Sequence, residues 1–298
     1  MPVQAVNNHA VITPDFISRA VDEVRRLKPD YGLLLGLYEK IFVEQENARS
    51  GIDLADYVIP DEVLSAKAKG QFPLVTIPEF IIDEKSAGAL LAKICEILAG
   101  ADDEISGTAK KIGGAVESKR IIPADLFPAF LSENDAVIKS IGNEFDIDAT
   151  ILDFVVYNSL KPSLVEFAGM MSRYLNTDNE WDRGYCPVCG SMPELSIFEE
   201  NGKRSLLCGF CGHRWNSKRV FCPFCENTDH ETLRYFEIED EEEYRVEVCD
   251  KCKRFIKTVN TQKLSRPVYL PLECIATPYI DVRFDEMGYR NGNVSVDR

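Results

Sequence analysis

Eight of the ten cysteines in this chain fall into four Cys-x-x-Cys pairs between residues 186 and 252. Two intervening residues allow both sulfurs of a pair to face one point in a tight loop, so each pair can supply half of a tetrahedral metal site. Because a metal needs two pairs, the spacing predicts two four-cysteine sites. The eight candidate metal ligands are Cys186, Cys189, Cys208, Cys211, Cys222, Cys225, Cys249 and Cys252.

The segments between the pairs indicate which pairs share a metal. Eighteen residues separate Cys189 from Cys208, and they contain two strand-like stretches around Asn201-Gly202, a strong hairpin signal. Twenty-three residues separate Cys225 from Cys249, and they contain two further strand-like stretches around an acidic tip. A hairpin returns the chain to its starting point. We therefore expect the first pair to join the second, and the third to join the fourth.

Three interpretations fit the chemistry of these sites. Four protein ligands leave no open position on a tetrahedral metal, which is typical of a site that only stabilises the fold. Tetrahedral sulfur ligation suits iron as well as zinc, so a redox role is the first alternative. Thiol–disulfide exchange at one of the pairs is the second alternative. The sequence predicts two metal ions, iron or zinc, without choosing between them.

The remaining reactive residues favour structural roles. Cys95 lies on the apolar face of an expected helix, and we predict that Cys95 and Cys274 are small buried side chains. His213 follows Cys211 closely, but four cysteines already complete a site, so we place it on the surface or beside the ligands. We find no catalytic triad, nucleophile elbow, phosphate-binding loop or dinucleotide fingerprint, and we expect neither catalytic nor cofactor-binding residues.

Composition limits the classes of partner and the compartment. The 298 residues carry 34 basic and 49 acidic side chains, a formal net charge of −15, which disfavours binding to nucleic acid or anionic membranes. The N-terminal sequence lacks the basic and apolar regions of a signal peptide, and the chain lacks the long apolar stretch of a membrane helix. We therefore expect a cytoplasmic protein with free or metal-bound thiols.

The first part of the chain, residues 1–180, has the apolar periodicity of helices. Thr13-Pro14 predicts a helix start. Apolar residues repeat at helical spacing in 34–42 and 87–98. We expect a solvated connector, or a helix with a loose loop, at 101–120, and two helical pieces within 151–175, because Pro162 interrupts that segment.

The sequence pattern changes at residue 181, from helical periodicity to short strands, tight turns and cysteine pairs. We predict an α+β chain with a helical domain at 1–180, four-cysteine modules of zinc-ribbon type at 181–219 and 220–262, and a tail at 263–298 that packs back on the modules. Metal binding drives the folding of such units, so replacing one ligand should unfold mainly its own module.

Several sequence segments resemble one known family. YLNTDNEWDRGYCPVCGSM at 174–192 is followed by CGFCGHRW, RVFCPFC and YRVEVCDKCKRFIKTV; together with 151–171 and 275–293 they resemble the formate dehydrogenase accessory protein family, FdhE. The resemblance covers roughly residues 150–293, whereas the earlier helices match only in size and character.

The resemblance implies a function as well as a fold. Members of this family have a helical N-terminal domain followed by two rubredoxin-like modules, and the eight paired cysteines would be their metal ligands. The resemblance further implies a cytoplasmic maturation factor, not an enzyme, that binds the catalytic subunit of a formate dehydrogenase. It leaves open whether the chain forms a homodimer.

Two other functions remain as alternatives. One is a metal-dependent redox protein that acts on another oxidoreductase. The other is a nucleic-acid-binding zinc-ribbon protein, which requires a basic, aromatic-rich hairpin. Only KRS at 203–205 and NSKR at 216–219 supply positive charge near the first module, and the second hairpin carries the acidic tip at 237–243, so this function is disfavoured.

Overall fold

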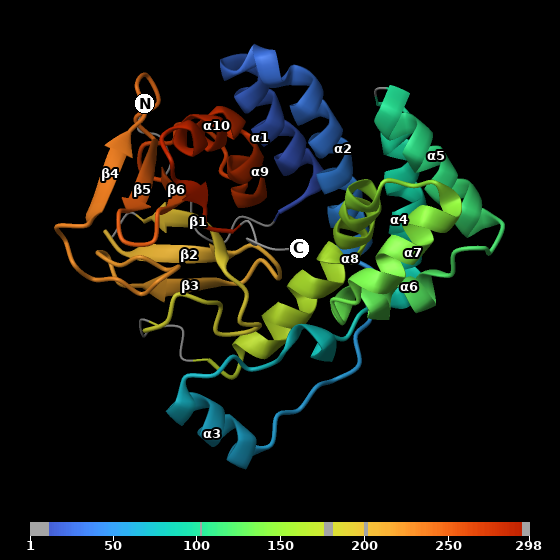
Figure 1. Ribbon diagram of the computed structural model, residues 1–298, viewed down its shortest axis with the longest axis horizontal. Helices are drawn as coiled ribbons and strands as arrows, with labels where there is room; N and C mark the ends of the chain where they lie inside the picture. The colour runs from blue at the N-terminus through green and yellow to red at the C-terminus, as the bar shows by residue number, and fades with distance from the viewer. Residues whose placement is uncertain (1–11, 102, 176–180, 200–201, 294–298) are drawn as a thin grey trace. The chain divides into compact units, whose positions relative to one another are not determined.

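The structure is a computed structural model, and it describes residues 12–101, 103–175, 181–199 and 202–293. The chain divides into two compact units (Figure 1). Among the described residues, the helical unit comprises 12–57 and Thr76–Phe167, and the sheet unit comprises Val58–Val75 and the described residues from Ala168 to 293. The α+β class predicted from the sequence is confirmed. The domain boundaries drawn at residues 180, 219 and 262 remain a prediction.

The helical unit follows the sequence pattern through its first helices. Thr13 begins the first helix as predicted, because its Oγ1 accepts a hydrogen bond from the Phe16 backbone N–H at 3.2 Å. Among the described residues, no helix combines the length and apolarity needed to cross a bilayer. The helices are α1 (Pro14–Leu27), α2 (Gly32–Arg49), α4 (Glu84–Leu98), α5 (Asp103–Glu117), α6 (Pro123–Leu131), α7 (Asp135–Phe145) and α8 (Ala149–Ser172), with short 3₁₀ turns at Pro29–Tyr31 and Ile77–Glu79.

Helix α4 confirms the predicted apolar face. Asp83 caps its start by accepting a hydrogen bond from the Ser86 N–H at 2.9 Å, and this bond lowers the pKa of the Asp83 carboxyl. Cys95 is buried as expected, and burial raises the pKa of its thiol to about 12. The buried face consists of Ala87, Leu90, Leu91, Ile94, Cys95 and Leu98.

Of the two alternatives for 101–120 the connector is wrong and the helix is confirmed, because most of this segment is the regular helix α5, followed by a turn at 118–120. Its buried residues Ala109, Ile112 and Ala115 are spaced three residues apart and form one apolar stripe. A Cβ built on Gly113 would stand 3.6 Å from the Cβ of Cys95, an ordinary van der Waals contact, so α5 and α4 pack closely at this point. A helix made largely of small residues can therefore pack well, although its low hydrophobicity makes it hard to recognise in the sequence.

The expected break at Pro162 does not occur, since α8 is one helix of 24 residues. Proline lacks the N–H that would bond to the carbonyl of Asn158, four residues earlier. In this chain the Asn158 carbonyl instead accepts a hydrogen bond at 2.9 Å from the Gln45 side chain of α2. Both side chains are buried. The Gln45 amide thus satisfies the acceptor that proline leaves free, and the helix continues.

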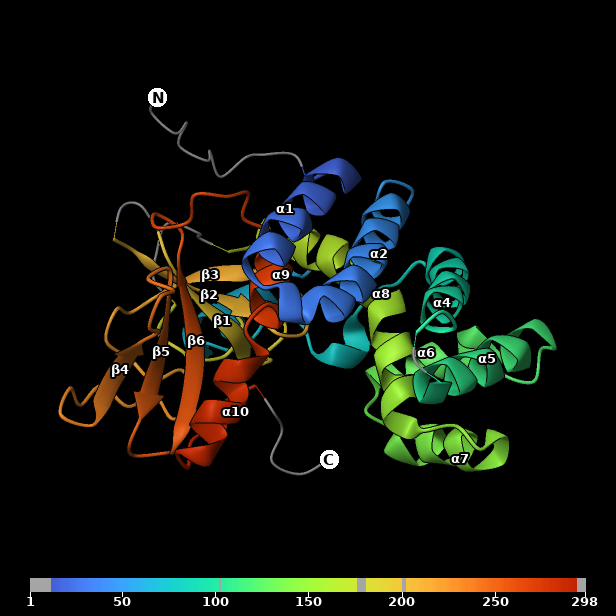
Figure 2. The same cartoon turned by 90° about the horizontal axis from the view of Figure 1, so that it is seen from above.

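One seven-stranded sheet carries the segments between the cysteines (Figure 2). Its strand order is β3-β2-β1-β6-β5-β4, and β7 pairs with β6. The first hairpin (β1, β2) and the second hairpin (β4, β5) are joined because β1 and β6 pair in parallel, with Leu195 opposite Lys257. The strands are β1 (Pro193–Phe198), β2 (Arg204–Cys208), β3 (Arg214–Ser217), β4 (Leu233–Glu237), β5 (Tyr244–Cys249), β6 (Arg254–Asn260) and β7 (Arg290–Asn291).

The C-terminal segment forms α9 (Leu270–Ile275) and α10 (Pro278–Glu286), which pack on one face of β5 and β6. Ile280 and Phe284 of α10 are fully buried against the strands, whereas Val282 on the opposite side of the helix is 61% exposed. Residues 294–298 of the expected tail lie outside the described residues. Helix α3 (Asp61–Gly70) also belongs to the sheet unit.

A buried polar cluster lies at the start of α9. Arg266 donates two hydrogen bonds of 2.7 Å to the two carboxylate oxygens of Glu273, and a third of 2.8 Å to the Tyr244 hydroxyl. The Tyr244 hydroxyl also bonds to Glu273. Burial raises the pKa of Tyr244. The Glu273 charge is thus compensated where it is fully buried.

Candidate metal centres

The structure gathers the eight paired cysteine sulfurs into two groups of four, with the pairing predicted from the hairpins. In the first group the sulfur–sulfur distances are 3.8 Å for Cys186–Cys211, 3.5 Å for Cys189–Cys208 and 3.6 Å for Cys189–Cys211. A tetrahedral zinc ion with bonds of about 2.3 Å requires sulfurs about 3.8 Å apart. The first group therefore has the dimensions of a four-cysteine metal site.

The second group has the same dimensions but a different exposure. Its sulfurs lie 3.7 Å apart in both Cys222–Cys252 and Cys225–Cys249. All four cysteines of the first group are buried, whereas Cys225 and Cys252 are half-buried. Solvent, chelators and small reductants should therefore reach the second site more readily than the first.

The four cysteine loops share one backbone geometry. The residue four positions after the first cysteine of each pair adopts a positive φ: +79° at Gly190, +72° at Gly212, +57° at Glu226 and +56° at Lys253. The N–H of each of these residues bonds to the carbonyl of that first cysteine, at 2.8–3.2 Å. Glycine adopts this conformation without strain, whereas Glu226 and Lys253 do so at a cost of about 1 kcal/mol each.

Two thiols of the first group, those of Cys186 and Cys211, resist ionisation unless a cation is present. Burial raises the pKa of Cys186 and of Cys211 above the usual thiol value. The pKa of Cys189 is lowered, because neighbouring thiols donate hydrogen bonds to its sulfur. The Cys211 backbone N–H also points at the Cys208 sulfur, at 3.4 Å. One thiolate is thus favoured before metal binding, and a bound metal would displace the remaining protons.

His213 lies beside the first group without joining it. Its backbone carbonyl accepts a hydrogen bond from the Cys208 N–H at 2.9 Å, and burial lowers the pKa of its imidazole to about 4. Within the described part of the chain, both candidate metal groups consist of cysteine alone. Cys95 and Cys274 belong to neither group.

A segment far away in the sequence, here called the strap (Leu74 and Val75), contacts the first group. The Leu74 N–H donates to the Pro187 carbonyl, and the Val75 N–H donates to the Val188 carbonyl, each at 2.9 Å. Segment 58–75 precedes the cysteines by more than a hundred residues, and no periodicity in the sequence points to this pairing. It fixes the loop between Cys186 and Cys189 from outside.

Arg204 is a second unforeseen element, because its place in KRS made it a candidate surface charge. Its side chain is fully buried in β2. It donates to the carbonyls of Lys218 and Phe221, at 3.0 and 3.1 Å, in the segment that leads into Cys222. It also bonds to Ser196 at 3.0 Å and to Glu247 at 2.7 Å. Arg204 therefore connects the first hairpin to the entry of the second site.

Comparisons with known proteins find a family match over the first cysteine group and several relatives of the chain. Residues 185–219 match the family described as "FdhE, central domain". The chain is 31% identical over 150 residues to "Protein FdhE homolog" of Aquifex aeolicus strain VF5, which is 49% of this chain and 52% of that protein. It is 32% identical over 117 residues to "Protein FdhE" of Escherichia coli O127:H6, which is 38% of this chain and 37% of that protein. The match thus spans about half, or less, of the length of these relatives.

The fold is similar to that of a solved relative. The crystal structure of the FdhE protein from Pseudomonas aeruginosa superimposes with a TM-score of 0.66 over 94% of each chain, at 21% sequence identity. At this identity the likeness establishes the fold. Together with the sequence matches, it confirms the predicted resemblance to the FdhE family.

Proposed function

We propose that this chain is a maturation factor that binds the catalytic subunit of a formate dehydrogenase and is needed for the assembly or activity of that enzyme. One observation carries the proposal: four cysteine pairs, in the order expected of the FdhE family, close into two groups of four sulfurs on a fold similar to that of a solved FdhE protein. The function is that implied by the family resemblance, under which this chain acts in the cytoplasm.

The eight cysteines are the proposed ligands of two metal ions, iron or zinc. The sulfur spacing fits either metal, because both accept tetrahedral sulfur ligation. Four protein ligands would leave no position for a substrate on the metal, so we propose that the chain is not itself an enzyme. Nucleic-acid binding is further disfavoured, because the Arg204 side chain is buried rather than available to phosphate.

The test is an anaerobic affinity purification from the source organism, read by mass spectrometry. The wild type is compared with the double variant Cys189→Ser, Cys225→Ser, which removes one ligand from each site. Cys274→Ser is the matched control, since Cys274 lies outside both sites. Recovery of a formate dehydrogenase catalytic subunit with the wild type and the control, and its loss with the double variant, supports the proposal. Recovery of an unrelated enzyme or of nucleic acid contradicts it.

A redox role is the second candidate, and the partial exposure of Cys225 and Cys252 favours it. An electron carrier needs a metal that is near the surface. Reversible bleaching of the iron–thiolate absorption on reduction, with activation of the partner enzyme only by the reduced form, would establish that role. Light scattering of the metal-loaded chain decides between monomer and homodimer.

A further inference from the structure

The face of β4, β5 and β6 that lies opposite α10 contains a hollow of about 380 Å³, here called the arginine groove. Tyr235, Glu247 and Ile256 stand in register across the three strands and share this face. Part of its lining comes from the segment that leads to the second metal site, including Val220, Phe221 and Phe224. Tyr235 and Val220 are 58% and 54% exposed. Exposed apolar side chains beside a hollow are typical of a binding surface.

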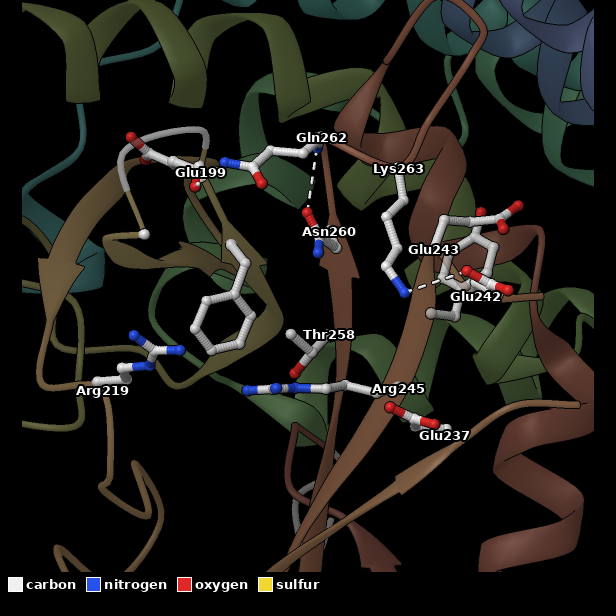
Figure 3. Close-up of a pocket in the computed structure, with 13 residues that line it drawn as sticks. Glu199, Arg219, Glu237, Glu242, Glu243, Arg245, Thr258, Asn260, Gln262 and Lys263 are labelled. Carbon is white, nitrogen blue, oxygen red and sulfur yellow. Dashed lines mark hydrogen bonds and ion pairs between the residues drawn. The ribbon is translucent and has the colours of Figure 1, made fainter.

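Two guanidinium groups stand at one end of this groove. Arg245 lies 4.0 Å and Arg219 lies 5.8 Å from the centre of the Phe198 ring, and both residues line the groove. Figure 3 shows the two side chains extending toward each other from opposite sides. A second, smaller hollow begins beyond them, and Arg219 and Arg245 line both. They are therefore presented to any chain that enters the groove.

The positive charge at this end is incompletely compensated. Glu247 accepts hydrogen bonds from Arg204 at 2.7 Å and from Arg245 at 2.6 Å, so a single carboxylate serves two guanidinium groups. The Nε of Arg245 is buried and has no hydrogen-bond partner. Among the described residues, no carboxylate lies within ion-pair distance of Arg219. A local excess of positive charge in a chain of net charge −15 is selective for an acidic partner.

The two ends of the groove set the direction of an occupant. Cys222 and Cys249 line the end at the second metal site, so an occupant would cover that site. Arg254, at the same end, is placed to offset the charge of the metal thiolates. Beyond Arg219 and Arg245 the smaller hollow is bordered by four glutamates and one lysine, Lys263, which pairs with Glu242 at 3.3 Å. The remaining carboxylates, including Glu243, would repel the continuation of an acidic chain. The occupant must therefore run from the two arginines toward the metal.

We propose that the arginine groove binds an acidic segment of the protein partner. A carboxylate of that segment bonds to Arg219 and Arg245, and an apolar side chain packs against Tyr235 and Val220. Arginine and tyrosine are among the residue types that contribute most to binding at protein interfaces. The inference rests on the proposed function, because it assigns the surface by which the catalytic subunit is recognised.

The first arm of the test measures the affinity of metal-loaded, full-length protein for the purified catalytic subunit by biolayer interferometry. Arg219→Glu should weaken binding at least tenfold at low salt, and Tyr235→Ala about tenfold. Lys40→Glu, the same change of charge at an exposed residue of the helical unit, should leave the affinity unchanged. If Arg219→Glu binds as tightly as the wild type, the groove is not the docking surface, although the proposed function stands.

The second arm separates failure of the groove from failure of the function. It uses a fluorescent nine-residue peptide of aspartate and glutamate around one phenylalanine, with a lysine-containing peptide of the same length as control. Binding of the acidic peptide alone, lost in Arg219→Glu, supports the groove even if the wild type does not bind the catalytic subunit. Absence of peptide binding overturns the inference. Binding of ATP or inorganic phosphate that depends on Arg219, without peptide binding, would identify a site for small anions and overturn it as well.

Discussion

The most informative single substitution is Arg204→Met, because Arg204 connects the two halves of the sheet unit. Methionine has a similar length but donates no hydrogen bond. The substitution removes the donors to the Lys218 and Phe221 carbonyls and one of the two guanidinium partners of Glu247. It thus tests whether the segment that enters the second metal site is fixed from the first hairpin.

The expected loss of stability follows from these contacts. A buried acceptor that loses its donor costs about 1–3 kcal/mol, and two carbonyls are affected. Glu247 keeps Arg245 at 2.6 Å, so its charge is not left unpaired, and the larger cost of an isolated buried charge does not arise. We expect Arg204→Met to lower the free energy of unfolding by about 3 kcal/mol. Because Phe221 directly precedes Cys222, we also expect faster release of the second metal.

Urea unfolding of the metal-loaded chain, followed by circular dichroism, measures the first effect. Transfer of metal to a chromophoric chelator measures the second. Arg214→Met is the matched control, since Arg214 lies on the neighbouring strand β3, is 37% exposed and stands 3.9 Å from Glu199. The control should change stability by less than about 0.5 kcal/mol. A loss below about 1 kcal/mol for Arg204→Met, with unchanged release of metal, would refute the assigned role.

Three further outcomes are expected. A chelator should remove the metals in two phases, the second site first, because Cys225 and Cys252 are half-buried; a single phase would contradict this order. Gln45→Leu should destabilise the chain by about 1–3 kcal/mol in urea unfolding, since it leaves the Asn158 carbonyl without its donor, and an unchanged midpoint would show that α8 tolerates Pro162 unaided. The pKa of the Cys95 thiol is raised from 9.0 to about 12 by burial. The contribution of this thiol to the free energy of unfolding is therefore present below pH 9 and is lost as the pH rises toward 12. Between about pH 8 and about pH 10 the free energy of unfolding, measured in urea, should fall by about 1 kcal/mol more in the wild type than in Cys95→Ala. An equal pH dependence of the two proteins would exclude the effect.

Local signals in the sequence were sufficient for part of the helical unit. The cap at Thr13 and the apolar face of α4 depend on residues within one or two turns, and both were predicted. The continuation of α8 through Pro162 depends on Gln45, 113 residues away from Asn158 along the chain. Likewise α5 is stabilised by packing of small residues against α4, and composition alone gave it the character of a connector.

The grouping of the cysteine pairs could be predicted more fully than the fold. Each hairpin returns the chain within a short stretch of sequence, so that the second pair of a group meets the first. The glycines at the positive-φ positions of the first two loops are visible in the sequence, whereas Glu226 and Lys253 carry the same conformation without a glycine to mark it. The buried role of Arg204 and the strap at Leu74 and Val75 depend on contacts made only after the strands have assembled.

The joined sheet leads to one prediction about the relation between the two metal sites. Two separate modules would respond independently, and Cys189→Ser would unfold only the first. In this structure β1 and β6 share a parallel ladder, and Arg204 fixes the entry to Cys222, so disorder in the first hairpin should reach the second site. We expect Cys189→Ser to retain clearly less than one tightly bound metal per chain, whereas the matched control Cys274→Ser should retain two. Elemental analysis after exhaustive dialysis measures the content. A value of one metal per Cys189→Ser chain, with unchanged affinity, would mean that the sheet does not couple the sites.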